Sequence, residues 1–225
     1  MGINSNIDPV QGREQKPGRR ERKRAENREK LMSAARVLFA DHGVEETTIQ
    51  EITDEADLGF GTFYNHFDDK DQLIDEVLAH TVATQGALIN EITEKIEDPA
   101  EVIAVSHRYF IRLADQDPRW AWLLVRLELS HDIALRSLAP FARRNLRRGS
   151  ETGRLKLVDQ ELALVSNGGA LLAVMRAVLD GNAPVNADVL HAEGILRMLG
   201  LSAEDAHDVA NRDFPRAAAS SSATL

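Results

Sequence analysis

The chain has 225 residues, carries a net charge of −9 and contains no cysteine. Hydrophobic residues make up 43% of it but aromatic residues only 5%, which is enough for one good core or two small ones. Only 14 glycines and 7 prolines are present, which favours helices over a turn-rich sheet. The composition therefore excludes disulfides and thiol catalysis and predicts an all-α protein.

Charge is distributed unevenly along the chain. The first 30 residues hold nine basic and five acidic side chains, a net charge of +4, whereas the remaining 18 basic and 31 acidic side chains give −13. A basic run attracts a phosphate backbone in a salt-dependent way, although a solvated, disordered tail has the same composition. The basic residues that crowd together are Arg19, Arg20, Arg22, Lys23, Arg24, Arg28 and Lys30.

Neither export nor membrane insertion is indicated. Asp8 and Glu14 precede any apolar run, which does not match the order of a secretory signal. The longest apolar stretch, residues 168–179, is broken by Arg176 and is shorter than the roughly 18 to 20 residues of a membrane span. We therefore expect a cytoplasmic protein that does not enter a membrane.

The N-terminal third predicts a long helix followed by two short ones. Apolar residues recur every three or four positions from Arg22, and Gly43 is expected to end this first helix. Thr48 and Glu51 form a capping box that begins a second helix, residues 57–59 interrupt it, and a third helix is predicted over 60–67. Residues 48–67 thus fit a helix-turn-helix, although a helical hairpin inside a bundle fits the same spacing.

The remainder of the chain is helical in pattern almost to its end. Asp98-Pro99 and Asp117-Pro118 mark helix boundaries. Further helices are predicted over about 70–96, 102–113, 119–129, 133–148, 160–179, 187–199 and 203–211. Residues 213–225 are small and polar and have too little apolar surface to fold.

Two stretches of the sequence resemble the signature of the TetR family of transcriptional regulators. They read TTIQEI from Thr47 and GTFYNHFDDKDQL from Gly61, and the segment AARVLFADHG from Ala34 is similar to the first helix of the family. The resemblance covers about residues 28–78, and the later residues match in architecture only. It implies an N-terminal DNA-binding domain and a larger C-terminal domain that dimerises and binds a small effector.

The resemblance also implies a division of the chain and a function. We expect a disordered segment at 1–18, a helix-turn-helix domain with a basic arm at 19–68, a helical effector-binding and dimerisation domain at 69–212, and a disordered tail at 213–225. The implied function is a homodimeric regulator on a palindromic operator, a repressor that an unknown small-molecule effector releases. No cofactor or metal is implied.

Roles for individual residues follow from the family pattern. Phosphate contacts are expected from Thr48, Tyr64, His66 and Lys70, and packing is the alternative for Tyr64 and His66. Base contacts are expected from Phe60, Gly61, Thr62 and Asn65, and Asn65 could pair with adenine through two hydrogen bonds. The basic arm contributes Arg19, Arg20, Arg22, Lys23 and Arg24.

Two residues depart from the family pattern. Asp57 stands where a glycine is usual in the turn, and Gly59 where a serine or threonine commonly caps the recognition helix. Asp tolerates a left-handed conformation and Gly is an acceptable N-cap, so we expect the motif to persist. An acidic Asp57 would slightly repel DNA.

The C-terminal half offers candidates for dimerisation and for effector binding. The apolar segment from Gln160 to Leu179, with Gly168-Gly169, would form a four-helix interface together with Ile195, Leu196 and Leu199, and burial of the same face inside one monomer is the alternative. Aromatic and polar residues that could line an effector pocket are His107, Tyr109, Trp122, Arg126, His131 and Met175, although packing explains each of them as well.

Enzymatic activity is not expected. The chain has no His-Glu-x-x-His pattern, phosphate-binding glycine loop or serine elbow, and its seven histidines are scattered. The other alternative is a helical adaptor or scaffold that does not bind DNA. The acidic body fits that alternative, but the basic arm and the pattern of residues 48–70 do not.

Overall fold

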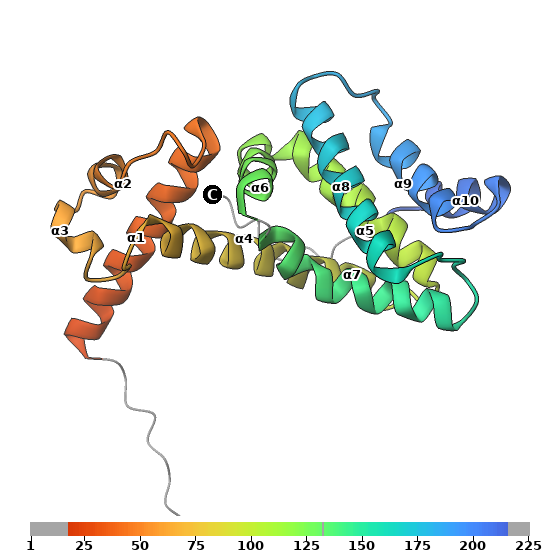
Figure 1. Ribbon diagram of the computed structural model, residues 1–225, viewed down its shortest axis with the longest axis horizontal. Coiled ribbons are helices and arrows are strands. Elements are labelled where there is room, and N and C mark those ends of the chain that lie inside the picture. Colours follow the sequence, from red (N-terminus) through yellow and green to blue (C-terminus); the bar gives the residue numbers. More distant parts are fainter. Residues whose placement is uncertain (1–17, 132, 216–225) are drawn as a thin grey trace, which may run out of the picture.

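The computed structural model describes residues 18–131 and 133–215, and the side chains of residues 127–138 lie outside this description. Both segments expected to be disordered fall mostly outside it as well. The described part contains helices and no strand, which confirms the all-α prediction (Figure 1). The helices are α1 Arg19–His42, α2 Ile49–Glu55, α3 Phe60–Phe63, α4 Lys70–Thr93, α5 Pro99–Gln116, α6 Pro118–His131, α7 Ile133–Glu151, α8 Gln160–Leu179, α9 Ala187–Met198 and α10 Ala203–Ala210.

A first core holds α1, α2 and α3 together. Phe39 of α1, Ile52 of α2 and Phe63 of α3 are fully buried in it, and Phe67 closes it from the loop before α4. Each of these side chains lies on the apolar face that the three- and four-residue spacing predicts. This core fixes the position of α3 at one end of the molecule.

The helix α4 connects this end to the rest of the chain. Its first turns place Leu73 and Leu78 in the first core, whereas Val82 and Ile89 pack into a second core. The change of core therefore falls inside α4 and not at the predicted boundary between residues 68 and 69. Because one continuous helix belongs to both cores, helix packing and not a flexible linker sets how the two cores are placed relative to each other.

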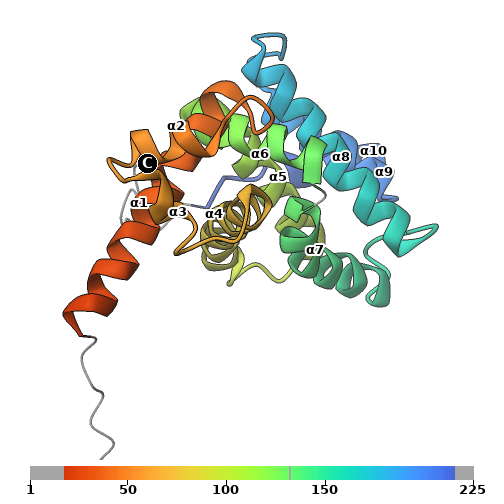
Figure 2. The ribbon, with the colours of Figure 1, turned by 60° about the vertical axis from the view of Figure 1, so that its left-hand side comes forward.

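The C-terminal body is a bundle built around α5. This helix packs against α8, α9 and α10 and also contacts α4, α6 and α7. Phe110 of α5 stacks on Trp120 of α6 with ring centroids 5.9 Å apart. In both views the N-terminal half of α1 projects away from this body, whereas its other end lies next to α6 (Figures 1 and 2).

An ion-pair network joins the loop between α7 and α8 to two helix starts. Arg154 donates from Nε and Nη2 to Asp98, at 2.9 Å each, and also binds Asp205 of α10. Burial raises the pKa of Asp98, but hydrogen bonds from Arg154 and the Ala100 amide outweigh burial and hold that pKa below its usual value.

The packed chain extends slightly beyond the predicted end at residue 212. The Phe214 ring lies 4.5 Å below the guanidinium carbon of Arg112. A cation over an aromatic face is attractive, so residues 213–215 follow the surface of α5.

Candidate nucleic-acid interface and interior cavity

The turn between α2 and α3 adopts the conformation that a helix-turn-helix requires. Asp57 has a φ of 54°, in the left-handed region, and the Leu58 amide donates to the Thr53 carbonyl oxygen at 2.9 Å. This six-to-one hydrogen bond is the usual way to end a helix at a left-handed residue. As expected, aspartate is accommodated here in the left-handed conformation.

The third helix is shorter than predicted. It ends at Phe63 and not at Phe67, because the amides of Asn65 and His66 bond to carbonyls three residues back, those of Thr62 and Phe63. Such tighter turns are common at helix ends. The chain still continues in helical turns to Phe67, so the side chains of 60–67 remain arranged around one axis.

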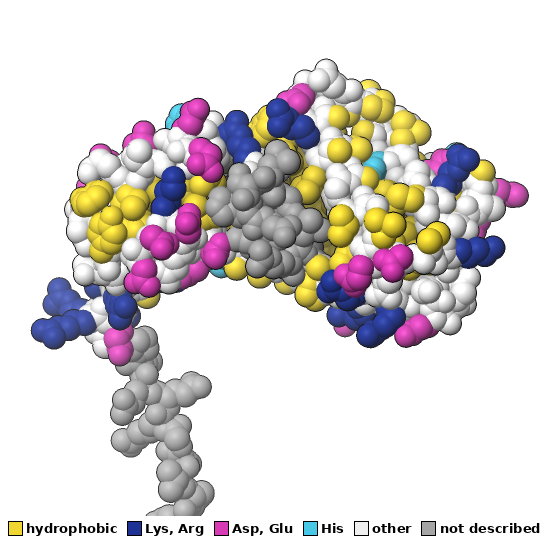
Figure 3. Space-filling view, viewed as in Figure 1, with side chains coloured by type: hydrophobic (Ala, Val, Ile, Leu, Met, Phe, Trp, Pro, Cys, Tyr) yellow, Lys and Arg dark blue, Asp and Glu magenta, His cyan; other side chains and the backbone are white. Residues whose placement is uncertain are grey.

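One face of this segment is open to solvent. Phe60 and Tyr64 are 46% and 53% exposed and meet edge to face with ring centroids 5.7 Å apart, while Phe63 beneath them is fully buried. Gly61 and Asn65 are also exposed and Thr62 is half-buried. Figure 3 shows apolar side chains gathered at the end of the molecule that carries α3. The four residues expected to read bases are thus brought together.

Thr48 has a capping role. Its hydroxyl accepts a hydrogen bond from the Glu51 amide at 3.2 Å, and the Glu51 carboxylate accepts from the Thr48 amide at 2.7 Å and from its hydroxyl at 2.8 Å. A carboxylate therefore already lies at the start of α2, where a phosphate was expected. A phosphate contact through Thr48 would have to displace it.

Lys70 is tied to the protein. Its ammonium donates to the carbonyl oxygens of Val44 at 3.0 Å and Thr47 at 3.1 Å, so it fastens the loop before α2 to the start of α4. An ammonium has three donors, which leaves one for another group. Lys70 therefore has a structural role that the family pattern, which implies a phosphate contact, does not reveal.

His66 lies half-buried behind Tyr64 and Asn65. Its Nδ1 is buried and has no hydrogen-bond partner in the described part of the chain. Burial lowers the pKa of His66, and the positive charges of Arg24 and Arg28 lower it further. Burial and two neighbouring cations thus place His66 where its charged form is disfavoured in the protein without DNA.

The basic arm is the exposed first half of α1. Arg24 donates to the carbonyl oxygen of Asn65 at 3.5 Å, which brings the arm next to the third helix. Arg28 forms an ion pair with Glu76 of α4 and lies over the Phe67 ring at 4.9 Å. The basic side chains at the free end of α1 are prominent in Figure 3 and include Arg19, Arg20, Arg22 and Lys23, all exposed.

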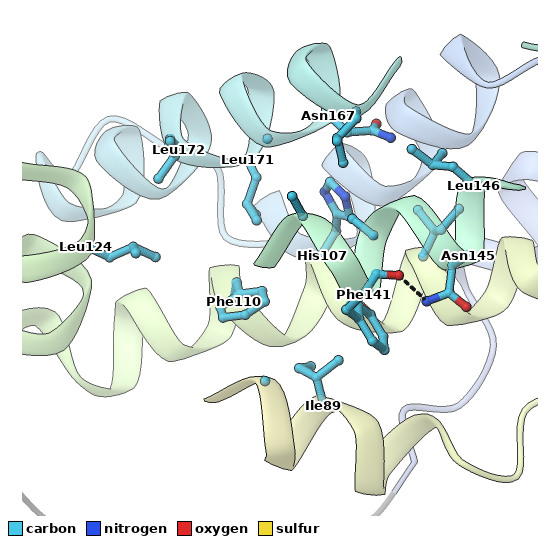
Figure 4. A pocket seen from close by; sticks show the side chains of 17 residues that line it. Ile89, His107, Phe110, Leu124, Phe141, Asn145, Leu146, Asn167, Leu171 and Leu172 are labelled. Carbon is cyan, nitrogen blue, oxygen red and sulfur yellow. Dashed lines mark hydrogen bonds between the residues drawn. The ribbon is translucent and has the colours of Figure 1, made fainter. Parts of the chain in front are cut away.

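A cavity of about 100 Å³ lies inside the C-terminal body (Figure 4). Its apolar wall comes from α4 to α8 and includes Ile89, Phe110, Leu124, Phe141, Leu146 and Leu171. The polar residues of its described lining are Ser106, His107, Asn145 and Asn167. A mostly apolar cavity with a few polar groups is the usual form of a small-molecule site.

Only one of the six predicted effector residues, His107, is found in the described lining of this cavity. Tyr109 donates from its hydroxyl to Gln85 Oε1 at 2.6 Å, and Met175 is buried in the core. Trp122 lies between Arg126 and Arg176, at 4.7 Å and 4.8 Å from their guanidinium carbons. The side chain of His131 lies outside the described residues.

Two cavity residues that the sequence argument missed are Asn145 and Asn167. Both are buried asparagines, Asn145 among the arginines of α7 and Asn167 within the apolar run of α8, which it interrupts. A polar residue at a core position is an informative signal, because burial of an amide is costly unless it is paired. That signal was present in the sequence.

The apolar residues expected to form a dimer interface are mostly core residues. Leu164, Leu171 and Met175 of α8, Ile195 and Leu196 of α9, and Leu199 directly after α9 are all buried inside the monomer. The opposite faces of these helices are open instead, with Leu162 at 61%, Val165 at 57%, Leu190 at 49% and Met198 at 49% exposure. For these six buried residues, the structure therefore agrees with the alternative of burial inside one monomer.

By length and composition alone, α8 could cross a bilayer. Its 20 residues include an 18-residue window with a mean hydropathy of 1.7, of which 22% is buried. This apolar stretch is longer than residues 168–179, which the sequence analysis identifies as the longest one. An apolar helix with two apolar faces is also what a helix between two protein layers requires.

The geometry defines a class of protein: a helix-turn-helix DNA-binding domain joined through a shared helix to a helical domain with an interior cavity. Residues 31–77 match the family model for bacterial regulatory proteins of the tetR family, and residues 98–212 match that of the tetracyclin repressor-like C-terminal domain. The chain belongs to the TetR family of transcriptional regulators. Proteins of this family are transcription factors and not enzymes, in agreement with the sequence prediction.

The curated relatives match only part of this chain. The HTH-type transcriptional repressor KstR2 of Mycolicibacterium smegmatis is 30% identical over 94 residues, which are 38% of this chain and 46% of KstR2. The probable acrEF/envCD operon repressor of Escherichia coli K12 is 31% identical over 94 residues, 40% of this chain and 43% of that protein. The chain thus matches less than half the length of these relatives.

Solved structures match over nearly their whole length. RolR, solved in complex with resorcinol, is 36% identical with a TM-score of 0.72, and the match covers 87% of this chain and 98% of RolR. FadR of Bacillus subtilis, solved with stearoyl-CoA, has a TM-score of 0.63 at 18% identity, with 77% of this chain and 99% of FadR covered. The second match shows a shared fold alone.

Proposed function

We propose that this protein is a sequence-specific DNA-binding regulator that acts as a homodimer in the cytoplasm, on the DNA of the nucleoid. The observation that supports this most is the exposed face of the third helix, with Phe60, Gly61 and Asn65, next to the basic half of α1. A short helix presented by a tight turn enters a major groove, and basic residues beside it bind phosphates.

The proposed contacts divide into two kinds. Asn65 and Thr62 face base edges, where an amide can form two hydrogen bonds with adenine and a methyl group can meet thymine. Tyr64, His66 and the arm residues contact phosphates and set the register without reading sequence. Thr48 and Lys70 act mainly by holding the motif together, because their polar groups are already engaged within the protein.

Dimerisation is assigned to the open faces of α8 and α9. Leu162, Val165, Leu190 and Met198 leave large apolar side chains in solvent on helices that pack next to each other. Exposed apolar patches mark contact surfaces, and a two-fold pairing of α8 and α9 gives a four-helix interface. A two-fold dimer reads a palindromic operator.

The proposed action is repression that a small molecule relieves. Several relatives are named as repressors, and RolR was solved with resorcinol, which supports a small-molecule ligand for the cavity. A ligand that binds one state better shifts the population toward it. Release follows if the favoured state no longer holds its two recognition helices about 34 to 36 Å apart.

The test is selection of bound sequences from a random double-stranded DNA pool at physiological salt, followed by titration of the recovered site. We expect the wild type to recover a palindrome. Tyr64→Phe should weaken binding to all sequences alike, by about fivefold per half-site and about 30-fold for a dimer on both half-sites, because each phosphate hydrogen bond is worth roughly 1 kcal/mol. Asn65→Ala should instead relax the preference at one position per half-site.

The chain provides a matched control. Tyr109→Phe makes the same chemical change at a tyrosine inside the C-terminal body and should leave DNA affinity unchanged. If wild-type protein with the helical circular dichroism of a folded chain enriches no sequence, the adaptor or scaffold alternative is favoured instead.

A further inference from the structure

The cavity in the C-terminal body is lined without charge over the part of the chain that the structure describes. Its polar groups are two amides, one hydroxyl and one imidazole, and the rest of the described lining is apolar. An ionised carboxylate or ammonium group buried here would lose its hydration and meet no counter-charge. The described lining therefore favours a neutral ligand.

The imidazole of His107 is neutral and tied to a second histidine. Its Nδ1 lies 2.9 Å from Nε2 of His191, so one nitrogen donates and the other accepts. Burial lowers the pKa of His107 to about 3, with the neighbouring His191 adding to the effect, and burial lowers the pKa of His191 to about 4. Near pH 7 the pair carries no charge into the cavity.

The side-chain oxygen of Asn167 has no hydrogen-bond partner among the described residues. Asn167 is 5% exposed, and this oxygen, Oδ1, is buried. A buried polar atom without a partner is costly, and a ligand that donates a hydrogen bond to it removes that cost. In Figure 4 the His107 ring points from α5 toward α8, the helix that carries Asn167.

The other two polar groups have already used a donor. The Asn145 amide donates to the Phe141 carbonyl oxygen at 3.0 Å, and the Ser106 hydroxyl donates to the Val102 carbonyl oxygen at 2.7 Å. What these groups can still offer the cavity through oxygen is lone pairs. The polar lining is thus biased toward acceptors.

Size and wall chemistry narrow the ligand further. The cavity volume of about 100 Å³ is of the order of the roughly 150 Å³ apolar cavity that accommodates benzene in an engineered protein. Phe110 and Phe141 provide aromatic wall on the side away from α8 (Figure 4). A single planar ring fits these limits, and a long acyl chain does not.

We propose that the effector is a neutral, single-ring hydroxylated aromatic compound whose hydroxyl donates a hydrogen bond to Asn167 Oδ1 in the cavity that also presents His107. This inference rests on the proposed function, in which the cavity is the effector site. A phenolic hydroxyl both donates and accepts, so it also satisfies His107 in either tautomer.

The test is calorimetric titration of the full-length protein with phenol, toluene and benzoate, which have similar size but differ in hydrogen bonding and charge. The wild type should bind phenol about tenfold more tightly than toluene, a difference of about 1.4 kcal/mol, and benzoate most weakly. Asn167→Leu should abolish this preference by weakening phenol and strengthening toluene. Asn182→Leu, at an exposed position after α8, is the matched control and should retain the preference.

Several outcomes overturn the inference. Equal affinity of the wild type for phenol and toluene shows that apolar burial alone directs binding, and tighter binding of benzoate shows a charged site. An unchanged preference in Asn167→Leu removes Asn167 from the site, and no binding of any probe removes this ligand class. Operator binding is measured on the same preparations, so failure of ligand selectivity with intact DNA binding leaves the regulator proposal standing.

Discussion

Asp57, in the DNA-binding turn, combines a strained backbone conformation with a negative charge that repels DNA. Its φ of 54° lies where a Cβ atom is crowded by the following carbonyl, and its charged side chain is exposed in the turn that precedes the third helix. We expect Asp57→Gly to raise the free energy of unfolding by about 0.5 kcal/mol, because relief of the crowding outweighs the extra freedom of the unfolded glycine. Urea denaturation checks this value.

The same substitution should raise DNA affinity slightly, because a negative charge is removed near phosphates. Asp57→Ala is the matched variant, since it removes the charge and keeps the Cβ. It should lower stability, as alanine lacks the local hydrogen bonding that lets aspartate tolerate this conformation. A gain of stability in Asp57→Ala would show that φ is not the source of the cost.

The buried pair of His107, which lines the cavity, and His191 predicts a stability change at mildly acidic pH. The folded pKa values of about 3 for His107 and about 4 for His191 lie below the unfolded value near 6.5, so the unfolded chain binds protons first as pH falls. Stability should therefore decline from pH 6.5 toward pH 4, by at most about 1.4 kcal/mol per pH unit for each histidine. Urea denaturation at pH 7, 6 and 5 measures the slope.

A double variant separates this pair from other groups. His107→Gln with His191→Gln keeps an amide hydrogen bond and should flatten the profile over this window, whereas the exposed His80→Gln should not. The Asp98 contribution is lost only at lower pH, because its folded pKa is held below the usual aspartate value. A steep profile in the double variant would assign the acid sensitivity elsewhere.

At the scale of elements, α6, like α4, contacts both the DNA-binding core and the cavity. Leu123 is buried in the core formed with α1 to α4, while the next residue, Leu124, lines the cavity. Arg126 also donates to the carbonyl oxygen of Ala40 near the end of α1. A shift of α6 on ligand binding would therefore displace α1 through their direct contact.

Adjacent leucines give this idea a matched test. Leu123→Ala and Leu124→Ala each remove a side chain that is 1% exposed, so each should destabilise the protein by about 2 to 4 kcal/mol. Only Leu123→Ala should weaken operator binding, by several fold, because it loosens the support of α1 and α4. Only Leu124→Ala should change ligand affinity. Fluorescence anisotropy and calorimetry distinguish the two, and identical profiles would contradict a division of roles along α6.

Periodicity and capping residues predicted most helices within a few residues. For a helix that is apolar on both sides, however, they could not say which side is buried in the monomer. In α8 both faces are apolar: Leu164 and Met175 point into the monomer, and Leu162 and Val165 point out. Which face is core depends on the neighbouring helices, and spacing does not carry that information. The cavity was missed for a related reason, because aromatic content pointed to Trp122 while the lining is assembled from five separate helices.

On the scale of the whole molecule, the basic arm is separated from the open apolar faces of α8 and α9. The basic half of α1 lies at one end, beside the third helix, and the open apolar faces of α8 and α9 lie in the C-terminal body (Figures 1 and 3). A net charge of −9 keeps DNA away from most of the surface. Pairing through α8 and α9 would leave both basic ends free, so that two of them can contact one duplex.

The assignment of the dimer interface predicts the effect of a buried charge. In a two-fold interface each substitution appears twice, so Val165→Glu places two carboxylates in an apolar contact without partners. The variant should sediment as a monomer in analytical ultracentrifugation at concentrations where the wild type is a dimer. Its affinity for the palindromic operator should fall by at least about 100-fold, because the second half-site no longer binds as part of the same complex.

Val158→Glu, on a fully exposed side chain in the loop before α8, should change neither property. A dimeric Val165→Glu protein would place the interface elsewhere and leave the open faces of α8 and α9 without this role.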